Sequence, residues 1–237
     1  MPSKKRSTKY VRSRFGVSAG LEPLIQEYRE QLLAEDWTEG DELPEAPVID
    51  AVAKGLGELL DQMCSARRYN DEWRVDPDPR YLGYGHYLSL KAEKIDAEYF
   101  FGFHLRSGFF WGTALRYPEQ LEAMTDAYWG RVSSLAEIGT TSYGPLLQVA
   151  ALAGVEARRT RTANSTVFRM IRDAALGRSK SGEKLPGPET LDVWLPLSTD
   201  AVTLVEKGAE ILRTLYTLNY DLYRAASQQS RARRGTR

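Results

Sequence analysis

The stretch that decides the fold is HYLSLKAEKIDAEYFFGFHLRSGFFWGTALR, residues 86–116. Its side chains alternate with a period of two, which is the pattern of strands whose two faces meet different surroundings. The alternation covers three runs, 86–94, 98–106 and 109–116. Asp96 lies in the first connection, and Ser107-Gly108 makes the second one tight enough for a hairpin. The sequence therefore predicts an antiparallel meander of at least three strands over about 86–116.

Helices are predicted on both sides of this meander, because apolar residues recur there at helical spacing. The expected ranges are 20–35, 47–66, 118–138, 164–176, a short helix after Pro145 and a last helix capped by Ser198 or Thr199. Glycine and proline mark the expected loops, which are 36–47, 69–85 and 177–190. The predicted fold class is α+β, with the meander packed against four to six helices.

Length and composition are those of a globular protein. The chain has 237 residues, of which 42% are hydrophobic and 27% charged, so it is long enough to bury a sizeable core. Both ends lack apolar periodicity and are rich in bases. We expect a single globular α+β domain over 18–226, flanked by basic disordered tails over 1–17 and 227–237.

The charges balance overall but are segregated along the chain. Lysine and arginine total 32 and aspartate and glutamate total 32, giving a net charge of zero. Residues 1–14 carry six bases and no acid, and residues 21–62 carry twelve acids against two bases. Residues 158–180 carry seven bases against one acid, and 224–237 carry five bases and no acid. The net charge of zero therefore predicts no particular partner. The basic and acidic segments, by contrast, each suit a partner of opposite charge.

The location of the protein is predicted from what the sequence lacks. Cys64 is the only cysteine, so no intrachain disulfide forms, and it falls within an apolar helical pattern as a small hydrophobe. No run of about 18 apolar residues predicts a membrane span, and no apolar segment follows the basic start as in a signal peptide. We expect a soluble, cytoplasmic protein.

No catalytic or cofactor motif is recognisable. The two histidines, His86 and His104, are accompanied by no Cys/His cluster, so no metal site is expected. Neither a phosphate-binding Walker loop nor a G-x-S-x-G nucleophile pattern occurs, and Gly83-Tyr84-Gly85 is too short for a dinucleotide fingerprint. We therefore expect no cofactor, and the catalytic residues, if any, stay unassigned.

An arginine-rich run supplies the main candidate binding residues. They are Arg158, Arg159, Arg161, Arg169 and Arg172. Clustered arginines with interleaved polar residues are suited to contacting the phosphate backbone of DNA or RNA. The competing interpretation is that this run neutralises the acidic segment 21–62 of the same chain.

A second candidate lies on the meander itself. His104, Arg106 and Arg116 would form a cationic patch on an aromatic sheet if the third strand paired closely with the second. Such a patch suits stacking of a base and binding of a phosphate. The competing interpretation is that Phe100 and Phe110 pack in the core while both arginines extend into water.

The acids near the first hairpin suggest an enzyme. Asp78, Glu93 and Asp96 are the candidates for binding a divalent metal in a divergent nuclease or phosphoesterase. The usual pattern of Pro-Asp followed by Glu-x-Lys is incomplete, because Ser89 stands where the second acid is needed before Lys91. The competing interpretation is a solvated hairpin edge.

Three functions therefore remain open. The favoured one is a nucleic-acid-associated binding or adaptor protein without catalytic activity. The alternatives are the metal-dependent nuclease or phosphoesterase, and a protein–protein interaction subunit whose partner binds the acidic 21–62 region. Whether the chain is an enzyme is left open by the sequence.

Overall fold

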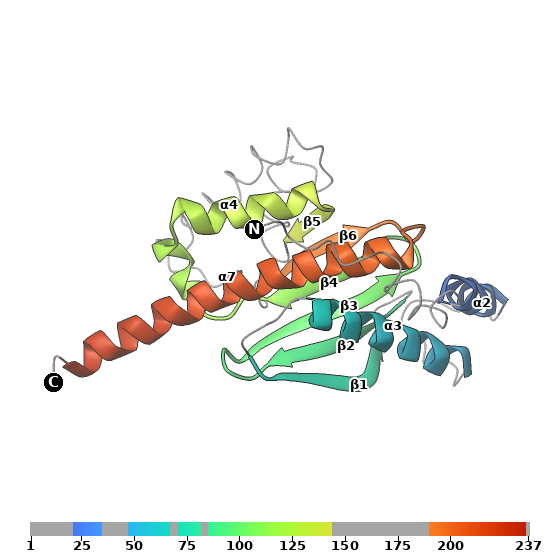
Figure 1. The fold of residues 1–237 in the computed structure, drawn as a ribbon, viewed down its shortest axis with the longest axis horizontal. Coiled ribbons are helices and arrows are strands. Elements are labelled where there is room, and N and C mark those ends of the chain that lie inside the picture. Colours follow the sequence, from blue (N-terminus) through green and yellow to red (C-terminus); the bar gives the residue numbers. More distant parts are fainter. Residues whose placement is uncertain (1–20, 35–46, 67–70, 82–84, 144–189, 236–237) are drawn as a thin grey trace, which may run out of the picture.

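The computed structural model describes residues 21–34, 47–66, 71–81, 85–143 and 190–235, and over these the chain has an α+β fold (Figure 1). The described helices are α2 (Leu21–Ala34), α3 (Pro47–Ala66), α4 (Asp126–Ser134) and α7 (Ala201–Gly235), with 3-10 turns η2 (Pro118–Ala123) and η3 (Leu135–Glu137). The strands are β1 (Trp73–Tyr81), β2 (Gly85–Ala92), β3 (Ala97–His104), β4 (Gly108–Ala114), β5 (Thr140–Tyr143) and β6 (Thr190–Leu195).

All six strands form one antiparallel sheet in the order β1-β2-β3-β4-β6-β5. The predicted meander is confirmed as β2, β3 and β4, and its second turn depends on Gly108. This residue has a φ of 113°, which side chains other than glycine rarely adopt. A Cβ at Gly108 would also collide with the carbonyl oxygen of Leu195, so β6 can approach β4 closely at this point.

One face of the sheet, called here the first face, forms the hydrophobic core. Its side chains are almost fully buried; they include Leu88, Leu90, Tyr99, Phe101, Phe103, Phe109, Trp111, Leu191, Val193 and Leu195. Figure 1 shows α3 and α7 lying across the sheet, and both contact its central strands. The apolar stripe of α7 is as wide as the sequence predicts, and Ile211, Leu212 and Leu215 are completely buried.

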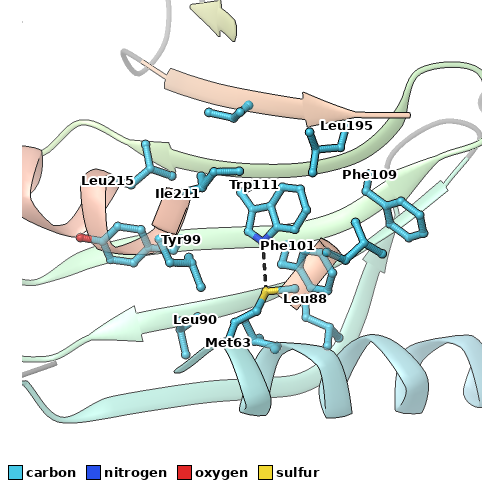
Figure 2. Close-up of a cluster of buried hydrophobic side chains, with 14 of the residues drawn as sticks. Met63, Leu88, Leu90, Tyr99, Phe101, Phe109, Trp111, Leu195, Ile211 and Leu215 are labelled. Carbon is cyan, nitrogen blue, oxygen red and sulfur yellow. Dashed lines mark hydrogen bonds between the residues drawn. The ribbon is translucent and has the colours of Figure 1, made fainter. Parts of the chain in front are cut away.

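The centre of this core joins the sheet to both helices. Figure 2 shows Trp111 of β4 donating its indole N–H to the sulfur of Met63 on α3, at 3.2 Å. A Cβ at Gly208 of α7 would lie 2.6 Å from that sulfur and 2.8 Å from the indole nitrogen. The absence of a side chain at Gly208 therefore lets α7 pack directly over the Trp111–Met63 contact.

A buried polar network fixes the position of α7 on the sheet. The amide of Asn219, fully buried, donates to the Thr113 hydroxyl at 2.8 Å and accepts from the backbone N–H of Arg116 at 2.9 Å. The Thr113 hydroxyl donates in turn to the carbonyl of Glu98 at 2.6 Å. These contacts give the buried polar groups partners, which a purely apolar residue at 219 would not.

The opposite face of the sheet, called here the second face, carries different side chains. Tyr87, Phe100, Phe110 and Trp194 form a chain of ring contacts across β2, β3, β4 and β6. Beside them the Ser89 hydroxyl donates to the Glu98 carboxylate at 2.9 Å. The second face is therefore aromatic and polar, whereas the first face is almost entirely apolar.

The first two helices form as predicted. Helix α3 has the expected bounds, and α2 differs from the expected 20–35 by one residue at each end. Tyr28 of α2 is bonded to Nε2 of His86 at 3.0 Å, both side chains being buried. Burial lowers the pKa of His86 to about 4, so this histidine is neutral at physiological pH and serves to attach α2 to β2.

Two sequence predictions between residues 69 and 138 need correction. Residues 73–81, expected within a loop, form β1, because an edge strand tolerates prolines whose missing N–H faces away from the ladder. The register shifts between Asp76 and Arg80, where these prolines lie. The single helix expected over 118–138 is instead η2, α4 and η3, interrupted at Met124, which has extended backbone angles.

The last helix also differs from its prediction at both ends. Its first turn is capped by Asp200, not by Ser198 or Thr199, since the Asp200 carboxylate accepts from the backbone N–H of Thr203 at 3.0 Å. Its other end extends to Gly235, so residues 227–235, expected in a disordered tail, are helical. The short strands β5 and β6 were not predicted.

Other predictions lie outside the described residues. These are the tail over 1–17, the loop over 36–46, the helices after Pro145 and over 164–176, and the loop over 177–189. Within the part of the chain that the structure describes, no helix is both long and apolar enough to cross a membrane.

Candidate nucleic-acid interface

The sheet patch predicted from the sequence is not brought together. His104 pairs with Gly108 at one end of β3, whereas Arg116 follows β4 and binds the carboxylate of Asp96, just before the other end of β3. The eight residues of β3 separate them by roughly 25 Å. Arg106 lies near His104, because its backbone N–H donates to the His104 ring at 3.3 Å. His104 and Arg106 therefore form one local pair, and Arg116 belongs elsewhere.

The predicted arginine run cannot be placed. Arg158, Arg159, Arg161, Arg169 and Arg172 all lie outside the described residues.

The acids proposed for a metal site do not converge. Asp96 is held between Lys91, at 2.9 Å, and Arg116, and hydrogen bonds from these bases lower the pKa of its carboxyl. Glu93 also lies near Lys91, whereas Asp78 is on β1. No group of three or more potential ligands from His, Cys, Asp and Glu is close enough to hold a metal ion, as far as the described ranges extend.

The remaining titratable core groups have structural roles. Cys64 is largely enclosed by the core, and burial raises the pKa of its thiol to about 12. It is therefore protonated and a poor nucleophile. His86 is on the first face and His104 on the second, so these neighbours on adjacent strands do not act together.

The acidic helices leave several carboxylates in water. Glu22, Glu27 and Glu30 of α2 and Asp50 and Asp61 of α3 are exposed. None of them forms an ion pair with a base within the described ranges.

The C-terminal part of α7 places several basic residues on one continuous helix. The helix has 35 residues and is therefore about 50 Å long. Figure 1 shows its C-terminal end projecting well beyond the sheet. No acid follows Asp221 in this helix, while four arginines do: Arg224, Arg231, Arg233 and Arg234.

A groove of about 670 Å³ lies beside this part of α7, between it, η2 and α4. Its polar lining is rich in amide and guanidinium groups. The polar or charged residues are Gln120, Thr125, Tyr128, Arg131, Asp221, Arg224, Gln228 and Gln229. These side chains come from η2 and α4, which follow each other in the chain, and from α7, which lies far from both in sequence.

The negative charge in the groove is already paired. Arg131 of α4 donates to the Asp221 carboxylate at 2.6 Å, and Gln120 of η2 donates to Gln229 at 3.1 Å. These two interactions hold α4 and η2 against α7. Arg224 remains exposed at the edge of the groove, where it adds positive charge.

Sequence reasoning identifies only part of this surface. The excess of arginine after residue 224 is visible, but fading apolar periodicity predicts a disordered tail there. Arg131, Gln120 and Gln228 carry no signal, since single polar residues on helices are usually solvated. Residues 225–232 contain no glycine or proline, and six of the eight are the good helix formers Ala, Gln and Arg, which is the available sign that the helix persists.

Comparison with known proteins gives no relative for this chain. No family model matches it, no curated protein resembles it, and no solved structure is similar to it.

Proposed function

We propose that this protein binds nucleic acid through the basic C-terminal part of α7 and the groove beside it. The observation that carries the proposal is the helical segment after Asp221, which holds four arginines and no acid and extends past the sheet. A projecting basic helix has the width of the major groove of DNA and can also follow a phosphate backbone.

The groove supports this proposal with a second kind of interaction. Guanidinium groups neutralise phosphates, and glutamine amides donate to phosphate oxygens or base edges. Arg224 and Gln228 lie one turn apart on α7 and both line the groove. The binding expected is salt-sensitive and shows little sequence preference, because arginines on a helix surface contribute mainly the nonspecific term. The exposed acids of α2 and α3 are not engaged by these arginines among the described ion pairs.

Fluorescence anisotropy with labelled single- and double-stranded oligonucleotides tests the proposal. The variant Arg224→Gln with Arg231→Gln removes two charges and keeps good helix formers. We expect it to weaken binding several-fold at low salt. The slope of log K against log salt should also become shallower, by about 0.9 for each phosphate that the variant no longer neutralises. Arg213→Gln is the control, because Arg213 is also exposed on α7 but lies away from the basic end.

Two results would contradict the proposal. The first is the absence of binding below about 100 μM at low salt, the weak end of nonspecific affinity. The second is binding that survives removal of Arg224 and Arg231 but disappears with Arg158→Gln and Arg159→Gln, which would move the site to the arginine run.

A further inference from the structure

Asp192 occupies an unusual place on the second face of the sheet. It lies in β6, where its register partner on β4 is Gly112. A Cβ at Gly112 would collide with Oδ1 of Asp192 and would lie 3.6 Å from Cδ2 of Phe100. The carboxylate therefore lies over the glycine, beside the ring of Phe100, in the space that a side chain at 112 would fill.

Aromatic rings border this carboxylate. Trp194 is two residues away on the same face of β6, and its ring lies 4.8 Å from that of Phe110, centroid to centroid. Tyr87 contacts both Phe100, at 5.5 Å, and Phe110, at 6.2 Å. The four rings thus form a continuous aromatic row on the second face, and the row meets the carboxylate of Asp192 at Phe100.

No base balances that charge among the residues that the structure describes. Asp192 makes no hydrogen bond and no ion pair within those ranges. The residues that flank it on the second face of β4 are Phe110, Gly112 and Ala114, and its partner on β5 is Ser142; none is charged. Its neighbours on β6, Thr190 and Trp194, are uncharged as well. A half-buried carboxylate without a partner is costly, and a cation would relieve the cost.

We propose that Asp192 and the half-buried rings of Phe100 and Trp194 form a binding site for an organic cation of the alkylammonium class. The electron-rich faces of aromatic rings attract such cations, and the carboxylate supplies the full opposite charge. A hydrated metal ion fits less well, because it needs several oxygen ligands and Asp192 is the only carboxylate that the described residues place at this position. The inference is independent of nucleic-acid binding, which involves α7 on the other side of the sheet.

The titration of Asp192 agrees with this site. Burial raises the pKa of its carboxyl to about 7. A bound cation favours the ionised form, so affinity for the cation should be full above about pH 8. It should fall by up to about tenfold for each pH unit below the pKa of the free site.

Tetramethylammonium chloride is the probe for a direct test. The indole N–H signal of Trp194 is assigned in a nitrogen-15 spectrum by its disappearance in the variant Trp194→Phe. We expect the probe to shift this signal with a dissociation constant on the order of 1–10 mM at about pH 8. Asp192→Asn should weaken binding at least about tenfold, since it removes the full charge, while Asp61→Asn, an exposed acid on α3, should leave it unchanged.

Three outcomes would overturn the proposal. One is that neutral tert-butanol shifts the Trp194 signal with the same affinity as the cation, because shape alone would then explain binding. Another is that Asp192→Asn binds the probe as well as the natural chain does. The third is that the natural chain binds no probe while Asp192→Asn is less stable at about pH 8, which would mean that a base of the chain itself already pairs with Asp192.

Discussion

The first and second faces of the sheet are built from alternate residues of the same strands, yet they bury different kinds of groups. The first face places Phe101 and Trp111 under α3 and α7, where both rings are almost completely enclosed. The second face leaves Phe100 and Trp194 half-buried, whereas Phe110, in the same row of rings, is buried. Period-two alternation thus separates a packing surface from one on which rings and charges remain accessible.

The polar groups on the two faces differ in the same way. Under α7, Asn219 and Thr113 form hydrogen bonds with each other and with two backbone groups. Burying these two polar side chains in the core therefore costs little free energy. On the second face, Asp192 has no such partner among the described residues. A fold that needed this position only for stability would be expected to use an apolar residue there, so the carboxylate points to binding.

The largest expected effect is on stability, and it compares the loss in free energy of unfolding when one tryptophan is removed from each face. Trp111→Ala removes a fully buried ring stacked on Phe101 at 5.0 Å, and it leaves a cavity between α3 and α7. We expect it to lower the free energy of unfolding by about 3–5 kcal/mol. Urea denaturation followed by circular dichroism measures this value.

The matched variant on the second face is Trp194→Ala. Because Trp194 is half-buried, its removal should cost about 1–2 kcal/mol, clearly less than that of Trp111. Equal costs for the two variants would mean that the second face is packed as a core, and the contrast drawn between the faces would fail.

The sequence predicts only part of the contrast between the two faces. Alternation from His86 to Arg116 predicted the meander and which residues share a face, because side-chain direction in a strand is a local property. Which face would be covered depends on α3 and α7, whose packing is non-local. Strands β5 and β6 escaped prediction because they are short and separated by a long stretch of sequence, so their pairing has no local signal.

The candidate sites escaped prediction for a similar reason. Asp192 is one acid in a run of apolar residues, and only the pairing of β6 with β4 places it over Gly112. The groove beside α7 needs Arg131 and Arg224, which are far apart in sequence. Sequence reasoning could detect the charge of the C-terminal end, but not the helix that carries it.

A second prediction uses pH to test the cost of the unpartnered carboxylate. The folded-state pKa of Asp192 is raised to about 7, above the value of about 4 in the unfolded chain. The folded chain thus binds the proton more tightly than the unfolded chain does. The contribution of Asp192 to the free energy of unfolding therefore falls as pH rises from about 4 to 7. Asp192→Asn removes that dependence. The variant should match the stability of the natural chain at about pH 4 and exceed it by about 4 kcal/mol at about pH 8, without added cation.

Thermal or urea unfolding of both proteins at several pH values measures this difference. Asp61→Asn again serves as the control, because it replaces an exposed carboxylate on α3 with an amide, as Asp192→Asn does on β6. A difference between Asp192→Asn and the natural chain that stays constant from about pH 4 to about pH 8 would show that Asp192 titrates normally. The second face would then hold no costly charge.

The smallest expected effect concerns the ion pairs at the edge of the second face. Glu98 accepts from Ser89 at 2.9 Å and lies 3.5 Å from Arg80, and the charged side chains are 40% and 48% exposed. Glu98→Gln keeps an acceptor for the buried Ser89 hydroxyl but removes the charge. It should lower stability by at most about 0.5 kcal/mol, and the effect should vanish in roughly 0.5 M salt, because exposed ion pairs are screened.

Glu98→Ala also removes the acceptor, and leaving Ser89 without it should cost about 1 kcal/mol more, independent of salt. If Glu98→Gln instead cost as much as Glu98→Ala at every salt concentration, the charge itself would be what matters at this edge. Arg80 and Glu98 would then behave as a buried pair, and the second face would be less open to water than its exposed fractions indicate.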